Sequence, residues 1–176
     1  MFKFIFPITL LFLTACNSAV LPNPTLIGAT FPSVNGTSLE GQDVEIPKDF
    51  SGAPALLLIG YAQRAQFDID RWILGALQAE LKVKLVEIPT IKGMVPEMIQ
   101  SYIDNGMRSG IPKEDWGSVI TVYEDAGKII SLLGNERPQS AYVVLIDSDS
   151  KIVWTSNRGY SATQILELKN QYLSLP

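Results

Sequence analysis

The composition of this 176-residue chain excludes several kinds of catalytic chemistry. The chain has no His and one Cys, which excludes a Ser-His-Asp triad, a Cys-His pair, a C-x-x-C couple, an intrachain disulfide and zinc ligation by His or Cys. Its net charge of −4 argues against a nucleic-acid partner, and 47% hydrophobic residues are too many for a disordered chain. An enzyme would have to use carboxylates, Lys, Arg, Tyr or Ser, and we expect neither a cofactor nor a metal site.

Residues 1–15 are predicted to be a lipoprotein signal peptide. A basic Lys3 precedes an apolar stretch over residues 4–13, which is too short to span a membrane as a helix. The sequence LTAC at its end resembles the bacterial lipobox, whose Cys is acylated and becomes the first residue of the mature protein. Cys16 is therefore predicted to carry acyl chains such as palmitate and to anchor the protein to a membrane. The alternative is an ordinary signal peptide with an incidental Cys.

Residues 16–30 are predicted to be a lipidated tether, because Pro, Asn, Ser and Thr are frequent there. Position 17 holds Asn and not the Asp that retains many bacterial lipoproteins in the inner membrane. By that resemblance the protein belongs to the bacterial cell envelope and faces the periplasm, and the outer membrane is favoured over the inner membrane. No later apolar run approaches the length of a membrane-spanning helix.

Residues 31–176 are predicted to form one domain of alternating strands and helices. The early strands are residues 44–47 and the continuous apolar run 55–62. A helix over residues 66–81 follows, with an apolar face that we expect to pack in the core; this face comprises Ile69, Trp72, Ile73, Ala76 and Leu77. Residues 83–88 return as a strand.

The second half of the domain continues the alternation. A helix over residues 95–107 carries an apolar stripe, and a strand over 118–123 precedes a short helix that Asp125 is predicted to cap and Gly134 to end. Residues 141–147 and 151–156 form a hairpin, and Ser161 caps the last helix. Strand–helix–strand connections of this length imply right-handed crossovers, hence an α/β fold with a central mixed sheet and helices on both faces. The stripe of the second helix comprises Val95, Met98, Ile99, Tyr102 and Ile103.

This order and several local sequences resemble the thioredoxin superfamily, in the branch of thiol:disulfide lipoproteins and peroxiredoxins. The first hairpin and core strand of that fold are similar to GQDVEIPKDFSGAPALLLIGYA, and its late hairpin is similar to AYVVLIDSDSKIVW. The mitochondrial ATP synthase assembly factor ten family, itself thioredoxin-like, is most similar to RSGIPKEDWGSVITVY followed by SAYVVLIDSDSKIVW. The resemblance covers residues 31–173 and implies a thioredoxin-like fold.

The resemblance places the two thiol positions of the superfamily at Ala65 and Asp68. A reactive thiol needs a Cys of low pKa at the helix N-terminus, so neither residue can attack a disulfide. The cis-proline that precedes the late strand in redox-active relatives falls near Ala141. The resemblance therefore implies a fold kept for binding or assembly, without oxidoreductase or peroxidase activity.

We expect a partner-binding face at the end of the sheet, where the loop before the first main helix meets the loop before the late hairpin. An aromatic ring, two guanidinium groups and the amides of a helix N-terminus suit an extended peptide or an acidic segment. Two of the residues also fit simpler roles, because acids such as Asp68 favour a first helical turn and Arg64 can be a solvated surface residue. The predicted face comprises Tyr61, Arg64, Ala65, Asp68, Arg137, Ser140 and Ala141.

The predicted function is that of a non-catalytic, membrane-anchored envelope lipoprotein. It binds an unknown envelope protein or peptide and assists assembly of a membrane complex, as an assembly factor or chaperone does. The alternative is a hydrolase or transferase that works through carboxylates or Ser, for which the chain has no positive motif. A charged segment with one aromatic residue is either a further contact surface or an ordinary loop; it contains Arg108, Lys113, Glu114, Asp115 and Trp116.

Overall fold

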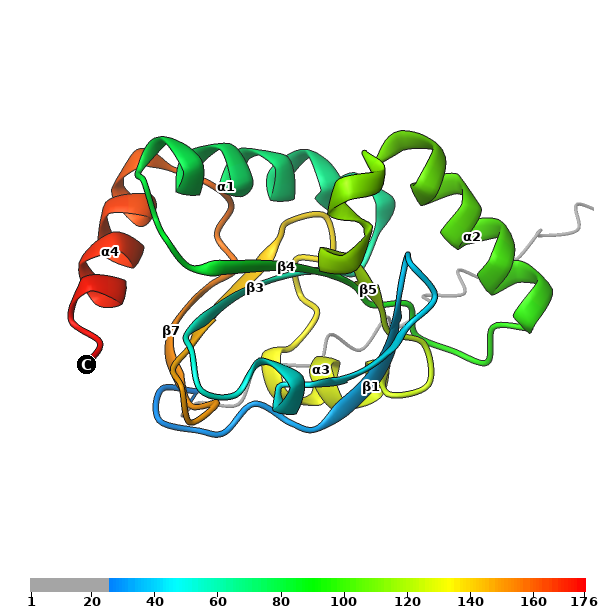
Figure 1. Cartoon of the computed structure of the whole chain (residues 1–176), viewed down its shortest axis with the longest axis horizontal. Helices are drawn as coiled ribbons and strands as arrows, with labels where there is room; N and C mark the ends of the chain where they lie inside the picture. Colours follow the sequence, from blue (N-terminus) through cyan, green and yellow to red (C-terminus); the bar gives the residue numbers. More distant parts are fainter. Residues whose placement is uncertain (1–25) are drawn as a thin grey trace, which may run out of the picture.

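The computed structural model describes residues 26–176, so the predicted signal peptide and Cys16 lie outside the described residues. Strands and helices alternate along the chain as the sequence predicts (Figure 1). The elements are β1 (Val34–Ser38), β2 (Asp43–Ile46), η1 (Lys48–Phe50), β3 (Ala55–Gly60), η2 (Gln63–Ala65), α1 (Gln66–Gln78), β4 (Lys84–Pro89), α2 (Glu97–Gly110), η3 (Lys113–Ser118), β5 (Ile120–Thr121), α3 (Ala126–Leu133), β6 (Tyr142–Ile146), β7 (Ile152–Ser156) and α4 (Ala162–Leu173).

The central sheet has the strand order β4-β3-β6-β7. β3 pairs in parallel with β4 and antiparallel with β6, and β6 pairs antiparallel with β7, so the predicted mixed sheet is confirmed. The first five residues of β3 and all five of β6 are buried. Continuous apolar runs such as ALLLI form strands of this kind because both faces of the sheet are covered.

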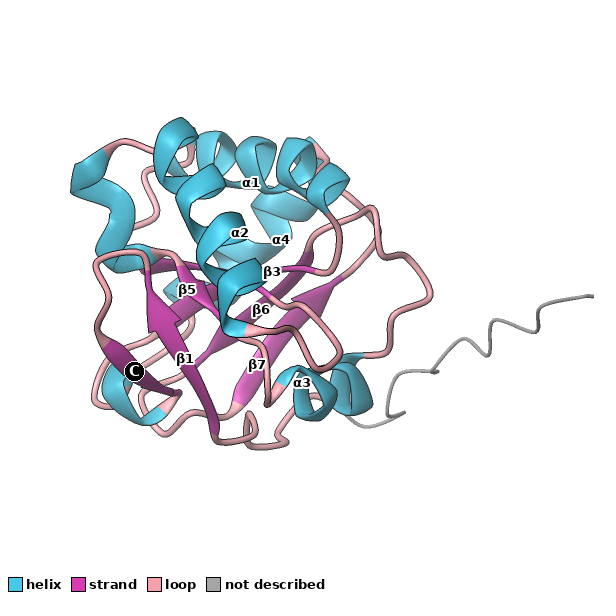
Figure 2. Ribbon diagram, turned by 90° about the vertical axis from the view of Figure 1, so that its right-hand side faces the viewer, coloured by secondary structure: helices cyan, strands magenta, loops and turns pink. Residues whose placement is uncertain are grey.

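Helices cover both faces of the central sheet, as predicted (Figure 2). The alternation of side chains along β3 sends Leu57 and Ile59 to the face packed by α3, and Leu56 and Leu58 to the face packed by α1 and α4. Each of these four side chains is fully buried, which favours folding by roughly 1.5–3 kcal/mol per residue. The core therefore consists of two layers on either side of β3.

A smaller sheet, β2-β1-β5, extends the fold beyond β4. Isolated parallel bridges join it to β4 at Glu87–Val119 and Thr90–Val122. β1 was not predicted, because its sequence VNGTS has too few apolar residues to show an alternation. Gly36 is required inside β1, since a Cβ there would lie 2.7 Å from Cγ2 of Ile120 and 2.9 Å from the carbonyl oxygen of Thr121.

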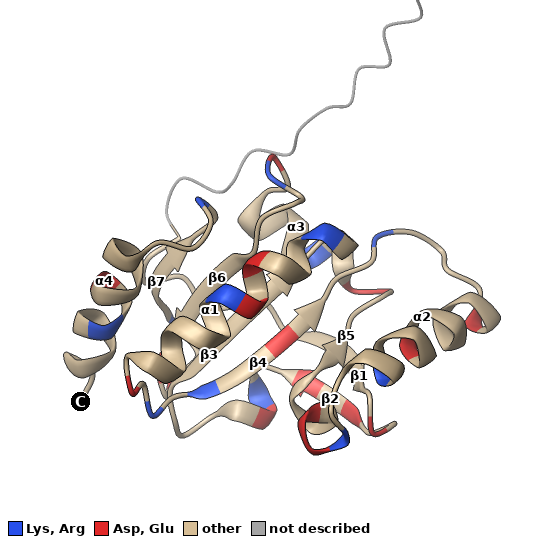
Figure 3. Cartoon of the chain, turned by 90° about the horizontal axis from the view of Figure 1, so that it is seen from above, with Lys and Arg blue, Asp and Glu red and all other residues tan. Residues whose placement is uncertain are grey.

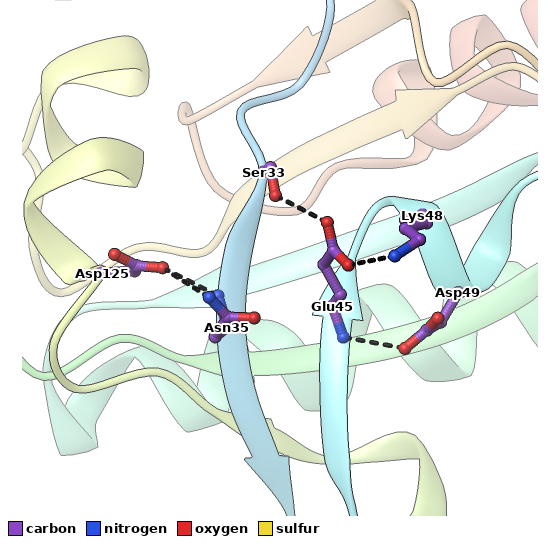
Figure 4. A network of polar contacts seen from close by, with 6 residues as sticks. All are labelled: Ser33, Asn35, Glu45, Lys48, Asp49 and Asp125. Carbon is purple, nitrogen blue, oxygen red and sulfur yellow. Dashed lines mark hydrogen bonds and ion pairs between the residues drawn. The ribbon is translucent and has the colours of Figure 1, made fainter.

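Polar contacts fix β1 and β2 to their surroundings (Figure 4). Asp125 occupies the predicted cap position of α3, but its side chain makes no capping bond there. Its carboxylate instead accepts the backbone N–H of Asn35 at 2.9 Å and pairs with Lys128 at 2.9 Å. The prediction that the Asp125 side chain caps α3 is therefore wrong, because its carboxylate is bonded to the backbone N–H of Asn35 in β1. Gly134 does end α3, with a φ of +76°, and the Ser161 hydroxyl does accept from the Gln164 N–H.

Two helices differ from their predictions. α1 ends at Gln78 rather than at residue 81, and Leu77, predicted to lie in the core, is 61% exposed. α2 runs from Glu97 to Gly110, and none of its residues is buried. Among residues 26–176, no helix is long and apolar enough to cross a membrane.

The segment from Leu26 to Phe31 lies beside β7 and its preceding turn. The Gly28 N–H donates to the carbonyl oxygen of Ile152 at 2.8 Å, and the Ile152 N–H donates to that of Ala29 at 2.8 Å. Leu26 packs against the core layer that contains α3. Residues 26–31 thus make contacts with the domain.

Candidate functional site

The candidate site is built at the junction of β3 and α1. β3 ends at Gly60, a single 3-10 turn follows at Gln63–Ala65, and α1 begins at Gln66. Gly60 lies close beneath the helix, since a Cβ there would be 3.1 Å from Cδ1 of Ile69. Ala65 is fully buried at this junction. The local structure therefore presents Gln63 and Arg64 to solvent and keeps Ala65 inside.

Asp68 joins three segments of the chain. One carboxylate oxygen accepts the backbone N–H of Ala141 at 2.9 Å, and the other accepts that of Tyr160 at 2.8 Å. Gly159, which precedes Tyr160, has a φ of +81°. A Cβ added at Gly159 would lie 3.7 Å from the Asp68 carboxylate. The first turn of α1 is thus bonded to the residue before β6 and to the loop before α4. The predicted meeting of the two loops is observed in this bond.

Three residues of the predicted binding face are corrected by their burial. Ala65 and Ala141 are completely buried, and Asp68 is 9% exposed. They shape the protein from inside and cannot contact a partner directly. Arg64 and Arg137 are exposed, whereas Tyr61 and Ser140 are half-buried. Asp68 is also more than an acid in a first helical turn, because its hydrogen bonds are made to other segments.

The half-buried Tyr61 packs on Tyr142, with the two ring centroids 4.8 Å apart. Its hydroxyl is buried without a hydrogen-bond partner, and burial raises the pKa of Tyr61 above its ordinary value. The Tyr142 hydroxyl accepts the backbone N–H of Arg137 at 3.0 Å, and the Asn157 amide donates to the Glu136 carboxylate at 2.6 Å. The sequence analysis did not identify three residues near Tyr61, namely Glu136, Tyr142 and Asn157. The sequence around each of them does not show that the start of β6 and the end of β7 lie close to Tyr61.

A hollow of about 360 Å³ lies at the start of α1, lined by Gln63, Arg64, Gln66 and Phe67. Phe67 is 71% exposed, which is unusual for a large aromatic side chain. The sequence contains a signal for this exposure, because Phe67 is out of phase with the apolar face of α1 that holds Ile69 and Trp72. The hollow therefore combines a guanidinium group, two amides and an aromatic ring.

Glu87 lies behind this hollow. The Gln66 amide donates to Asp70 at 3.0 Å and to the Glu87 carboxylate at 3.4 Å, so Gln66 connects the surface to the interior. Glu87 is 7% exposed, and burial raises its pKa to about 7, with a further contribution from the nearby charge of Asp70. Glu87 does not line the hollow itself, and the sequence marked it only as part of a strand.

Several of the carboxylates and Ser hydroxyls that the alternative hydrolytic or transferase chemistry would need make structural hydrogen bonds in the part of the chain that is described. Within residues 26–176, no cluster of three or more His, Cys, Asp or Glu side chains could hold a metal ion. The hydroxyl of Ser156 bonds to the Gln164 side chain, and that of Ser161 caps α4. The buried Asp68 carboxylate is held by two backbone N–H groups, which leaves it poorly placed to act on a substrate.

Comparison with known proteins yields solved structures of similar fold. No family model matches the chain, and no curated protein matches it. The structure of yeast Sco1 with copper bound has a TM-score of 0.57 at 13% identity, covering 88% of this chain and 97% of that chain. The thiol peroxidase from Chromobacterium violaceum has a TM-score of 0.56 at 15% identity, covering 86% of this chain and 89% of that chain.

A lipoprotein thioredoxin, Etrx1 from Streptococcus pneumoniae, has a TM-score of 0.53 at 13% identity, covering 80% of this chain and 98% of that chain. The chain has a thioredoxin-like fold. At these identities the similarity establishes the fold and not an activity. The sole Cys of this thioredoxin-like chain is Cys16, so residues 26–176 contain no thiol.

Proposed function

We propose that this thioredoxin-like protein is a non-catalytic lipoprotein of the bacterial envelope. It is anchored by lipid on Cys16 and binds a protein or peptide at the start of α1. The observation that carries this proposal is Asp68, which the sequence resemblance places at a thiol position and which is buried and bonded to the backbone of Ala141 and Tyr160. A position used in that way contributes to rigidity rather than to thiol chemistry.

The chemistry of the hollow favours an extended, acidic segment with an apolar side chain. Arg64 provides a positive charge beside the N-terminus of α1, where the helix dipole also favours negative groups. Phe67 provides an exposed aromatic surface, and Gln63 and Gln66 provide amide donors and acceptors. Lys, Arg, Asp and Glu are otherwise interspersed over the face that bears α1 and α2 (Figure 3). The specificity of binding thus arises from the hollow and not from a large charged patch.

The partner belongs to the same side of the membrane as the anchor. Assistance in assembling a membrane complex agrees with the resemblance to the assembly factor ten family. That family acts on the matrix side of the mitochondrial membrane, which corresponds to the bacterial cytoplasm. A lipoprotein faces the opposite side, so the client is an envelope protein other than the matrix-side part of ATP synthase.

The test is site-specific photocrosslinking in the full chain expressed in a bacterial envelope. A photoreactive amino acid replaces Gln63 at the rim of the hollow, and mass spectrometry identifies the crosslinked partner. Arg64→Glu should reduce crosslinking at least fivefold because it reverses the charge that attracts an acidic segment. It should change the free energy of unfolding by under about 0.5 kcal/mol, since the side chain is exposed.

The matched control is Lys151→Glu. Lys151 is exposed like Arg64, but it lies at the start of β7, at the opposite end of the central sheet. This variant should leave crosslinking at Gln63 unchanged. Equal losses for the two charge reversals, with both variants folded, would show that the start of α1 is not the binding face.

A further inference from the structure

The side of helix α2 that faces the domain is attached through hydrogen bonds. The Asp104 carboxylate accepts from the hydroxyls of Tyr123 at 2.9 Å and Thr121 at 3.2 Å. One turn later, the Arg108 guanidinium donates to the carbonyl oxygen of Leu39 at 2.7 Å. Residues spaced by four lie on one face of a helix, so this face holds α2 against β1 and β5 through hydrogen bonds.

The opposite side of α2 exposes large apolar side chains. Met98 is 82% and Tyr102 80% exposed, and Ile99 beside them is half exposed. Met94, just before the helix, is also fully exposed. An amphipathic helix of a monomer normally turns this side toward its own core. In α2 only Ile103 and Met107 are half-buried apolar residues on the side that faces the domain, none of the 14 residues is buried, and Met98 and Tyr102 point outward.

The same outward ridge continues with two glycines. Steps of four residues lead from Met98 and Tyr102 to Gly106 and Gly110. Glycine is among the least favourable residues in a helix. Nothing in residues 26–176 requires glycine here, since an added Cβ at Gly106 or Gly110 would meet no atom within 4 Å and neither residue has a positive φ. The ridge thus has a bulky half and a small half.

We propose that α2 forms the interface of a two-fold dimer with a second copy of this chain. When two such helices pack antiparallel, Tyr102 of each copy lies over Gly106 of the other, and Met98 lies over Gly110. The bulky half of one ridge then packs against the small half of the other, so that the side chains of the two helices do not collide. A two-fold axis makes the contact self-complementary, so it closes after two copies.

The size and place of the surface agree with a reversible dimer. The exposed Met94, Met98, Ile99 and Tyr102 offer on the order of 500 Å² per copy, against roughly 800 Å² in an interface of standard size. α2 lies on the side of the molecule away from β7 and α4 (Figures 1 and 3). Pairing through α2 therefore leaves β7, where the chain from residue 26 docks, unobstructed in both copies. The dimer does not depend on the proposed function.

The experiment is cysteine crosslinking of the full chain in bacterial membranes. Two differently tagged copies are co-expressed, one with Tyr102→Cys and one with Gly106→Cys, and membranes are treated with an oxidant. The antiparallel register brings these positions within disulfide distance. The amount of mixed-tag dimer should exceed, by at least tenfold, the amount from a control pair with Leu74→Cys and Leu77→Cys, which replaces exposed apolar residues of α1. Unmutated copies give the background from Cys16.

A second measurement uses sedimentation of the detergent-extracted chain. Gly106→Glu places a charge in the interface and should shift the dimer to monomer, with an unchanged circular dichroism spectrum because the site is open in the monomer. Gly127→Glu, at an open helical glycine of α3, should leave the dimer intact.

Equal crosslinking of the two cysteine pairs, or stronger pairing of Tyr102→Cys with itself, would overturn the proposal. A crosslink from α2 to a different protein would also overturn it. Protection of Tyr102→Cys from an impermeant maleimide in the absence of any dimer would do the same, because another occupant then covers α2.

Discussion

At the scale of single residues, Asp68 has the largest consequence for the candidate site. A carboxylate in this place holds the start of α1, the residue before β6 and the loop before α4 in one arrangement. The Asp68 carboxylate accepts both hydrogen bonds, and hydrogen bonds to a carboxylate are stronger than those between neutral groups. The rigidity of the site therefore depends on the charge and on both oxygens of this residue.

Asp68→Asn should destabilise the domain by about 1–3 kcal/mol. The amide retains one acceptor oxygen but turns an NH2 group toward a backbone N–H, which leaves a buried donor without a partner. Urea unfolding of the wild type and the variant measures this difference. Asp70→Asn is the matched control, because Asp70 is exposed and accepts from the neighbouring Gln66 side chain, and its effect should stay below about 0.5 kcal/mol. Equal effects of the two substitutions would contradict the role of Asp68.

Glu87 should make the stability of the domain depend on pH. Its pKa is raised from 4.5 to about 7 in the folded state, so between these values the folded chain holds a proton that the unfolded chain releases. Stability should therefore fall as the pH rises from about 4.5 to about 7, by up to about 3 kcal/mol. The lowered pKa values of Glu45 and Asp125 act at more acidic pH, outside this window.

Glu87→Gln should remove this dependence. The variant should be more stable than the wild type at pH 8 and nearly equal to it at pH 5, because the wild type is protonated at the lower pH. Urea unfolding at both values tests the prediction. A parallel decline of wild type and variant between pH 5 and pH 8 would assign the dependence to another group.

At the scale of elements, Tyr160 fixes the packing of α4 against α1. Its ring meets Trp72 edge-on, with centroids 5.5 Å apart, and lies directly over Gly75. A Cβ at Gly75 would be only 2.4 Å from Cε2 of Tyr160, so a glycine in the middle of α1 is required by this contact. The loop before α4 is thus held at Tyr160 in two ways, by its ring on α1 and by its backbone N–H, which donates to Asp68.

Gly75→Ala should cost about 1–3 kcal/mol of stability, because the added methyl group must displace the Tyr160 ring. The free-energy cost of that displacement exceeds the gain in helix propensity. Thermal unfolding measures the loss. Gly127→Ala in α3 provides the comparison, because an added Cβ there meets nothing within 4 Å and should stabilise by up to about 1 kcal/mol. The same sign for both substitutions would show that the Tyr160 contact is not tight.

The strands and helices differ in how far their sequences predict them. The sequence predicts β3 and β6 because continuous apolar runs of five or six residues are typical of strands buried on both faces. The sequence VNGTS of β1, in contrast, becomes a strand only through its pairing with β2 and β5. The period of α2 was correct, but a stripe such as Met98 and Tyr102 shows where the apolar face is and not what covers it. Asp68 is a common residue for a helix start, so its bonds to residues 73 and 92 positions away could not be inferred.

At the scale of the whole molecule, Cys16→Ser should abolish lipid attachment. The reason is the LTAC sequence at the end of the apolar run, whose Cys is the predicted acyl acceptor. Labelling with a radioactive fatty acid and cell fractionation should show a labelled, membrane-bound wild type and an unlabelled variant. Asn17→Asp serves as the control, because it should keep the label and move the protein toward the inner membrane. Equal labelling of wild type and Cys16→Ser would contradict the lipid anchor.

If Cys16 carries lipid as proposed, the docking of residues 26–31 along β7 also sets how far the domain can reach from the membrane. With lipid on Cys16, residues 17–25 are all that separate the membrane from the docked segment, and a fully extended chain of that length spans at most about 35 Å. Confinement to that radius gives the domain a local concentration of on the order of 10 mM against a partner in the same patch of membrane. A binding face of only millimolar affinity is then mostly occupied when its partner stands within reach. With the proposed anchor, distance from the bilayer, more than tightness of binding, would select which envelope proteins this domain meets.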